Sequence, residues 1–356
     1  MPAARPSSLD VVTIGNALVD VLARAGDELI GSLGLHKGTM TLATPEQVAH
    51  AASVLDPEAR VSGGSAANTA VGMASLGAAP AYIGRVDNDE LGQIFSDDIN
   101  RAGVYFEHHA PDREPIAEGP IGPGTGHCFI LVTPDAERTM ATYLGVAGQL
   151  SDEDIDEDLI ASARVTYLEG YLWDLPETKQ AMRHAASVAH RAGQLTALSL
   201  SDPFVVERHR GELIGLVEGG EVDIVFGNEE EVKLLYDASW AEAASRLASA
   251  GVLAALTRGA AGSVVLRGAD QVAVPPSPCS GVVDTTGAGD LYAAGFLAGL
   301  TRGSPEVAGS ELISGADLDR CGRLGSLAAA EVISHMGSRP LVSLVALARE
   351  AGLLGL

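Results

Sequence analysis

The residues best suited to chemistry lie in the run Asp284–Leu300, DTTGAGDLYAAGFLAGL. A Gly-Ala-Gly turn leads directly into an apolar segment of helical composition, so Gly287 and Gly289 leave backbone N–H groups uncovered where the helix starts. Such N–H groups and the helix dipole together attract anions. Asp290 would lie in the first helical turn, where a carboxylate beside a bound phosphate can accept the proton of an attacking hydroxyl. Taken alone, the run also fits a glycine turn followed by an ordinary acidic residue.

Other polar residues follow predicted strands. Asn16 and Asp20 come after the apolar strand Leu9–Gly15, and the acidic run Asn228–Glu231 follows the strand Asp223–Phe226. Taken alone, Asp20 is typical of a turn, and Asn228 is typical of a helix N-cap with acidic residues in the first turn. Asn228 and Glu231 are spaced i and i+3, so one helix face can present both side chains.

Composition excludes several classes of protein. The chain has 356 residues, of which 46% are hydrophobic, and its net charge is −24. This charge argues against nucleic acid or an anionic membrane as the main partner. The three cysteines are far apart in the sequence, which disfavours a disulfide framework or a zinc knuckle and suits a reducing cytoplasm. Met1–Ser8 contain no apolar segment and no long apolar run follows, so we expect neither a secretory signal nor a transmembrane helix.

Two nucleotide-binding motifs are absent from the sequence. None of the lysines, Lys37, Lys179 and Lys233, follows a glycine, so the Gly-Lys pair of a P-loop is missing. No G-x-G-x-x-G follows a predicted strand either, which excludes the dinucleotide fingerprint. Any phosphate site must therefore be built by a different loop.

The elements that position these residues can be predicted from the pattern. Gly63–Leu76, GGSAANTAVGMASL, predicts a turn and a helix of small residues with Ser65 as N-cap. From residue 165 onward strands alternate with helices, which predicts a parallel sheet covered on both faces that binds ligands at the carboxyl ends of its strands. The predicted strands are Val165–Leu168, Leu195–Ser201, Asp223–Phe226 and Val252–Thr257, followed by the hairpin Ser263–Leu266 and Gln271–Val274.

Two motifs together resemble the signatures of the ribokinase-like, PfkB family of carbohydrate kinases. The run Asp284–Asp290, DTTGAGD, is similar to the C-terminal signature. The N-terminal signature is matched by Gly63–Asn68, GGSAAN, and by Gly84, Asp87 and Gly92 in IGRVDNDELG. Because the two motifs are far apart and in the family's order, the resemblance covers nearly the whole chain.

The resemblance implies a fold and a reaction. The fold would be a doubly wound α/β core with a mainly parallel sheet flanked by helices, formed by residues 1–15, 49–103 and 147–356. Residues 16–48 and 104–146 would form a small β-rich lid. The reaction would transfer a phosphate from ATP to a hydroxymethyl group with Mg²⁺, and a monovalent cation such as K⁺ could bind near Asp284 and Thr286. The protein would be a monomer or a homodimer.

The resemblance also implies a role for individual residues. The catalytic base would be Asp290, the backbone of Gly287, Ala288 and Gly289 would form the anion hole, and Arg138 would approach the transferred phosphate. The acceptor would be bound by Asn16, Asp20, Gly64, Asn68 and Phe204. ATP would contact Asn228, Thr257, Gly259, Gly262 and His335, with Ser338 beside His335 at the adenine. Mg²⁺ would be held near Asn228 and Glu231 through water.

Within the family the sequence is most similar to adenosine kinases and their bacterial homologues. The matching residues are Asn16 and Asp20, the segment 198–204 (LSLSDPF) and the segment 223–228 (DIVFGN), and they imply that Phe204 stacks on a purine. Thr286 departs from this pattern, because adenosine kinases carry asparagine there and sugar kinases commonly carry threonine. Adenosine is therefore the first expected acceptor, and ribose, fructose or a related furanose is the alternative. A nucleoside-binding protein without catalysis is disfavoured because Asp290, Asn228 and Glu231 are all present.

Overall fold

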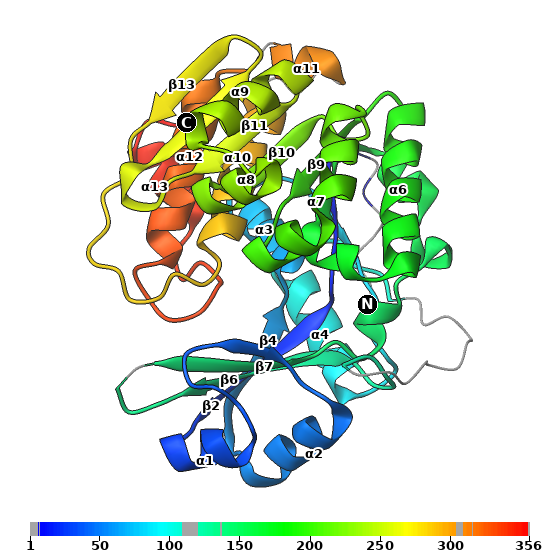
Figure 1. Ribbon diagram of the computed structural model, residues 1–356, viewed down its shortest axis with the longest axis vertical. Helices are drawn as coiled ribbons and strands as arrows, with labels where there is room; N and C mark the ends of the chain where they lie inside the picture. The colour runs from blue at the N-terminus through cyan, green and yellow to red at the C-terminus, as the bar shows by residue number, and fades with distance from the viewer. Residues whose placement is uncertain are drawn as a thin grey trace.

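Two β-sheets organise the chain, as the ribbon in Figure 1 shows. The structure, a computed structural model, describes residues 6, 8–108, 120–135, 137–303, 309–314 and 316–354. The larger sheet has eight strands in the order β13-β12-β11-β10-β9-β8-β1-β5, and all neighbours are parallel except β11–β12 and β12–β13. Its strands are β1 (Leu9–Ile14), β5 (Pro80–Ile83), β8 (Ala163–Glu169), β9 (Leu195–Ser199), β10 (Ile224–Asn228), β11 (Leu253–Thr257), β12 (Ser263–Arg267) and β13 (Asp270–Val274).

Helices cover both faces of the larger sheet because its strands are apolar on both sides. One face is covered by α3 (Ser65–Ser75), α10 (Ala288–Gly303), α12 (Leu318–Val332) and α13 (Leu344–Glu350). The other is covered by α5 (Glu157–Ala161), α6 (Pro176–Arg191), α7 (Pro203–Glu218), α8 (Glu229–Tyr236) and α9 (Trp240–Ala250). Short α11 (Ser310–Ser314) contacts α10. The predicted doubly wound α/β sheet is thereby confirmed.

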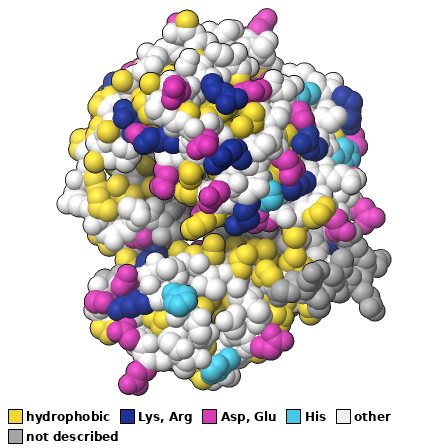
Figure 2. Space-filling model, in the orientation of Figure 1, with side chains coloured by type: hydrophobic (Ala, Val, Ile, Leu, Met, Phe, Trp, Pro, Cys, Tyr) yellow, Lys and Arg dark blue, Asp and Glu magenta, His cyan; other side chains and the backbone are white. Residues whose placement is uncertain are grey.

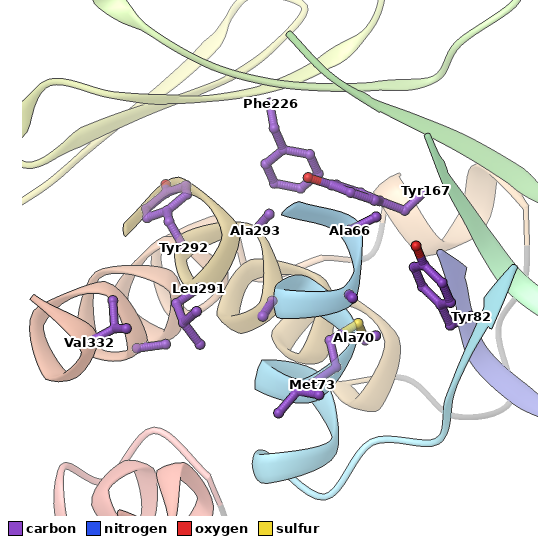
Figure 3. Packing of buried hydrophobic residues seen from close by; sticks show 14 of the residues in the cluster. Ala66, Ala70, Met73, Tyr82, Tyr167, Phe226, Leu291, Tyr292, Ala293 and Val332 are labelled. Atoms are coloured by element: carbon purple, nitrogen blue, oxygen red, sulfur yellow. The ribbon is translucent and has the colours of Figure 1, made fainter. Parts of the chain in front are cut away.

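The helix α10 packs against both α3 and α12, and Figure 3 shows side chains of α3 and α10 gathered below Tyr167 and Phe226. A Cβ added to Gly295 of α10 would lie 2.3 Å from the carbonyl oxygen of Leu324 on α12. A glycine is therefore required at this crossing. This close contact holds α10, which carries Asp290 in its first turn, against α12.

The smaller sheet has five strands in the order β3-β7-β6-β2-β4. They are β2 (Leu18–Arg24), β3 (Met40–Leu42), β4 (Pro57–Gly63), β6 (Gly126–Val132) and β7 (Arg138–Tyr143). The helices α1 (Asp27–Ser32) and α2 (Pro45–Val54) supply apolar residues to one face, and α4 (Glu90–Arg101) contacts β4 and β2. One boundary differs from expectation: β4 pairs with β2 in this sheet, although residues 49–103 were expected in the α/β core.

Alternation along β2 decides which side chains reach the larger sheet. Val19, Val21 and Ala23 are buried in the core with α1 and α2, whereas Leu18, Asp20 and Leu22 are only partly buried on the opposite face. In register, Asp20 pairs with Cys128 of β6. Figure 2 shows apolar side chains along the junction of the two sheets on the visible face, with acidic and basic side chains interspersed over the helices above. None of the described helices has the length and apolarity needed to cross a bilayer.

Candidate active site

The site lies at the carboxyl edge of the larger sheet, where polar residues end successive strands. Asn16 follows β1, Glu169 ends β8, Asn228 ends β10 and Thr257 ends β11, and the register pairs Asn228 with Thr257. Parallel strands bring their carboxyl ends to one edge, which explains why residues so distant in sequence meet there. The sequence predicted a ligand site at the carboxyl edge of the sheet, and these polar strand ends lie at that edge.

Asp290 is held by two donors from α3. Ser65 Oγ donates to Asp290 Oδ1 at 2.6 Å, and Asn68 Nδ2 donates to Asp290 Oδ2 at 2.9 Å. Burial raises the pKa of the Asp290 carboxyl, and these two hydrogen bonds oppose the rise. Ser65 was expected to be the N-cap of α3, but Gly64 holds that position with a φ of 95°. The hydroxyl of Ser65 is therefore free to reach Asp290.

The glycine turn before α10 has the expected backbone form. Gly287 has a φ of 78°, and a Cβ there would lie 2.9 Å from the side chain of Ser338. The N–H of Ala288 donates to Thr285 O at 3.2 Å, which closes the turn. Gly289 has no atom within 4 Å of an added Cβ, so the turn faces open space on that side.

Arg138 connects the smaller sheet to this turn. Its Nη1 forms an ion pair with Asp284 and donates to Thr286 Oγ1 at 3.0 Å. Asp284 also accepts the N–H groups of Thr286 and Gly337. Burial raises the pKa of Asp284, but these hydrogen bonds and the charge of Arg138 outweigh burial, and the net shift is downward. Arg138 Nε is buried without a partner among the described residues. The guanidinium thus retains a donor for a further acceptor.

Asp20 lies on β2 beside Gly63 and Gly64, two positions where a side chain would collide with its neighbours. A Cβ on Gly63 would lie 2.5 Å from the Asp20 carboxyl, and one on Gly64 would lie 2.2 Å from Asn16 O. Burial raises the pKa of Asp20 to about 6, although the charges of Arg339 and Arg138 lower it. Asp20, Gly64 and Asn16 therefore lie together, as expected for an acceptor site.

The sequence analysis did not single out Glu169, which binds both Asn16 and the start of α3. It is 1% exposed, accepts Asn16 Nδ2 at 3.0 Å and accepts the N–H of Ala66 at 2.8 Å. Burial raises its pKa to about 7 despite these donors. The acidic end of the predicted strand at 165–168 was the only available signal, and nothing in the sequence connects it to Asn16.

The loop after α12 also differs from what the sequence predicted. Ser338, expected beside the adenine, instead donates from Oγ to Asn68 Oδ1 at 3.2 Å. This bond points the amide N–H₂ of Asn68 toward Asp290. Arg339, which sequence reasoning did not single out, donates to the carbonyl oxygens of Ser62 and Ala67.

Asn228 and Glu231 form a capping box at the start of α8. Asn228 Oδ1 accepts the N–H of Glu231 at 2.9 Å, and its Nδ2 donates to Glu231 Oε1 at 2.7 Å. Glu231 is 5% exposed, and burial together with the charges of Asp202 and Glu230 raises its pKa to about 7. The Asn228 amide oxygen and both Glu231 oxygens already accept hydrogen bonds within this capping box, and no group of three His, Cys, Asp or Glu among the described residues could hold a metal directly. Mg²⁺ held near Asn228 and Glu231 through water stays a prediction.

The residues expected to bind ATP come from separate elements, and their contact with ATP stays a prediction. Gly259 and Gly262 have positive φ values and bound a short 3₁₀ turn at Gly259–Ala261 between β11 and β12. Thr257 Oγ1 donates to Gly227 O at 3.5 Å. His335 pairs with Glu331 at 3.2 Å.

Phe204 lies at the start of α7 and is 68% exposed. Asp202, the N-cap of that helix, accepts the N–H of Phe204 at 2.7 Å. The structure records no ring contact for Phe204 with another described aromatic residue. Its stacking on a base stays a prediction.

This geometry defines a class of enzyme: a carboxylate beside an anion-binding turn, at the carboxyl edge of a doubly wound sheet, suits phosphoryl transfer to an alcohol. The comparison with known families agrees. The model described as pfkB family carbohydrate kinase matches residues 58–343, and the chain belongs to that family. It is a phosphotransferase with an alcohol acceptor, and kinases of this family use ATP, generally with Mg²⁺.

Several individual proteins are similar to this chain. A structure of adenosine kinase from Sinorhizobium meliloti is 46% identical, with a TM-score of 0.83 over 97% of this chain and 99% of that one. A probable sugar kinase from Rhizobium etli is 41% identical, with a TM-score of 0.83 over 98% of this chain and 100% of that one. The adenosine kinase of Saccharomyces cerevisiae is 28% identical over 82% of this chain and 89% of its own length.

Proposed function

We propose that this kinase transfers the γ-phosphoryl group of ATP to the 5′-hydroxymethyl group of a nucleoside, with adenosine as the first acceptor. The observation that carries the proposal is the placement of Asp290 at the start of α10, held by Ser65 and Asn68 and facing Asp20 of the smaller sheet. Asp20 can accept hydrogen bonds from a vicinal diol while Asp290 stands at the reacting hydroxyl.

The transfer needs one proton acceptor and several groups that balance charge. Asp290 takes the proton as the acceptor's O–H bond breaks and its oxygen bonds to the γ-phosphorus. The bond from that phosphorus to the bridging oxygen breaks, and ADP leaves with the electron pair. The glycine turn at 287–289 would balance the charge on the transferred group, together with Arg138, which donates to Thr286 beside that turn. Bound Mg²⁺, held near Asn228 and Glu231 through water, would neutralise the remaining phosphate charge.

Two observations favour a nucleoside over a free sugar. On β2, Leu18 and Leu22 flank Asp20 on its partly buried face, which offers an apolar surface to a flat base beside the diol. The likeness to an adenosine kinase at 46% identity supports the same acceptor. Thr286 and the likeness to a probable sugar kinase support the alternative, a ribose- or fructose-like furanose.

Two further expectations stay proposals. The smaller sheet would act as a lid that covers the acceptor. The monovalent cation near Asp284 and Thr286 also stays a prediction, and Arg138 already supplies positive charge to both side chains.

The test is ADP release by the purified protein with Mg-ATP and a panel of adenosine, other nucleosides, ribose and fructose. We expect turnover on adenosine, and loss of about 10²–10⁴ in rate in Asp290→Asn, because the variant lacks a proton acceptor. A melting curve should show that the variant is folded, and adenosine binding should persist in it.

Each outcome decides a different part of the proposal. Preference for ribose or fructose would replace the nucleoside with the furanose alternative and keep the mechanism. Full activity of Asp290→Asn would overturn the role of the carboxylate, and no turnover on the whole panel would contradict the proposed acceptor class.

A further inference from the structure

Arg339 is a partly buried arginine that the proposed chemistry does not use. It follows α12 and reaches back to two segments that begin the acceptor site. Its Nε and Nη2 both donate to Ser62 O, at 3.2 and 2.7 Å, and its Nη1 donates to Ala67 O at 3.0 Å. Ser62 immediately precedes the Gly63–Gly64 turn, and Ala67 lies in the first turn of α3. The guanidinium therefore joins the two ends of that turn.

The charge of Arg339 has no directly bonded carboxylate among its described contacts. Its hydrogen-bond partners are two carbonyl oxygens and the hydroxyl of Ser62, which Nη2 reaches at 3.0 Å. Ser62 Oγ in turn donates to Asp98 of α4 at 2.6 Å. The acidic groups that interact with the Arg339 charge come from different elements: Asp20 of β2, Asp98 of α4, Asp290 of α10 and the phenol of Tyr82 on β5.

We propose that Arg339 is a positioning residue that fixes the Gly63–Gly64 turn against α3 and supplies a positive charge that Asp20 and Asp290 share. The inference deepens the proposed function and rests on it for the roles of these two carboxylates. Its geometric part depends on the hydrogen bonds that the guanidinium donates to the carbonyl oxygens of Ser62 and Ala67. Its electrostatic part depends on the charge interactions of the cation with carboxylates of β2, α4 and α10.

The surroundings of both carboxylates show why this charge matters. Burial raises the pKa of Asp290, while Ser65, Asn68 and Arg339 lower it. Asp20 is likewise raised by burial, and the cations that oppose the rise are Arg339 and Arg138. The other acidic groups that interact with Asp290 are Asp20, Glu169, and the phenols of Tyr167 and Tyr171, none of which would favour its charged form.

Comparing Arg339→Met with Arg339→Lys separates the effect of the positive charge from the effect of the guanidinium hydrogen bonds. The test compares kcat, KM for the acceptor and the pH profile of kcat/KM in both variants. In Arg339→Met we expect a higher acceptor KM, kcat lower by roughly tenfold at neutral pH, and an acidic limb displaced upward by about one pH unit. Arg339→Lys should return the limb toward its original position, because the charge remains. The lysine variant should keep a raised KM, because an ammonium cannot donate to both Ser62 and Ala67 as the guanidinium does.

The matched control is Arg323→Met, which removes an exposed arginine of α12 whose partner is Asp319 at 3.8 Å. This variant should leave all three kinetic quantities unchanged. If Arg339→Met and Arg339→Lys lose activity alike with an unmoved acidic limb, Arg339 is only a structural residue and the inference is overturned. Melting curves identify any variant that fails to fold, and Arg339→Gln then replaces Arg339→Met.

A second readout needs no turnover. Carbon-13 NMR of the side-chain carboxyls in the unliganded protein, with Asp20→Asn and Asp290→Asn for assignment, should show both titrations displaced upward in Arg339→Met by about 0.5–1 pH unit. Displaced titrations in a protein that phosphorylates nothing on the panel would contradict the proposed function and leave the shared charge standing. Unmoved titrations in an active kinase would reject this inference alone.

Discussion

At the scale of single residues, the site carries carboxyl groups with raised pKa values. Burial raises the pKa of Asp20 to about 6 and that of Glu169 and Glu231 to about 7. In the unfolded chain these groups return to values of 3.8 for Asp and 4.5 for Glu. Between about pH 4 and pH 7 the folded protein therefore holds protons that the unfolded chain has lost, and stability falls as the pH rises through this window.

Asp20→Asn tests this relation. The neutral amide removes the cost of ionising this partly buried carboxyl, so the variant should exceed the wild type in stability by on the order of 2 kcal/mol at pH 8. At pH 3 the two proteins should be nearly equal, because Asp20 is then protonated both in the folded protein and in the unfolded chain. Denaturant unfolding at both pH values measures the difference, and Asp319→Asn on an exposed face of α12 is the control. An equal difference at both pH values would contradict the raised pKa.

At the scale of elements, α10, which carries Asp290, crosses α12 at a glycine. Gly295→Val should destabilise the protein by about 3 kcal/mol, because the added Cβ meets the backbone of Leu324 at 2.3 Å and the helices must separate. Gly215→Ala of α7 is the matched control, since its Cβ meets no atom within 4 Å and alanine favours a helix. Urea unfolding compares the two variants. Equal stability of Gly295→Val and wild type would show that the crossing can relax.

The same elements show what sequence could and could not predict. The helix that begins at Ala288, the small-residue helix α3 and the strands β8 to β13 follow from local hydrophobic pattern and glycine turns, and the structure confirms them. β4 was missed because its sequence, PEARVSG, is largely exposed and has no apolar alternation. Glu169 and Arg339 were missed for a different reason: each is a lone charged residue whose partners are far away in the sequence, so no local pattern identifies it.

At the scale of the whole molecule, the smaller sheet meets the larger unit at the proposed acceptor site, where Arg138 of β7 forms an ion pair with Asp284 before α10. We expect Arg138→Met to loosen the smaller sheet, because the variant leaves Asp284 without this cation. Small-angle X-ray scattering of the unliganded variant should give a larger radius of gyration than the wild type. Adenosine with a non-hydrolysable ATP analogue should reduce the radius in the wild type. Identical scattering for both proteins in both conditions would contradict a role of this ion pair in holding the sheets together.

The segment Gly337–Arg339 contacts Asp284, Asn68, Ser62 and Ala67. A ribosome makes this segment only after every signature residue from Asp20 to Asp290 has been translated, and chains generally begin to fold from the N-terminal side during synthesis. A nascent chain can therefore form both sheets while its acceptor site is still incomplete. The contacts that complete the proposed acceptor site can therefore form only after both sheets and Asp290 have been translated.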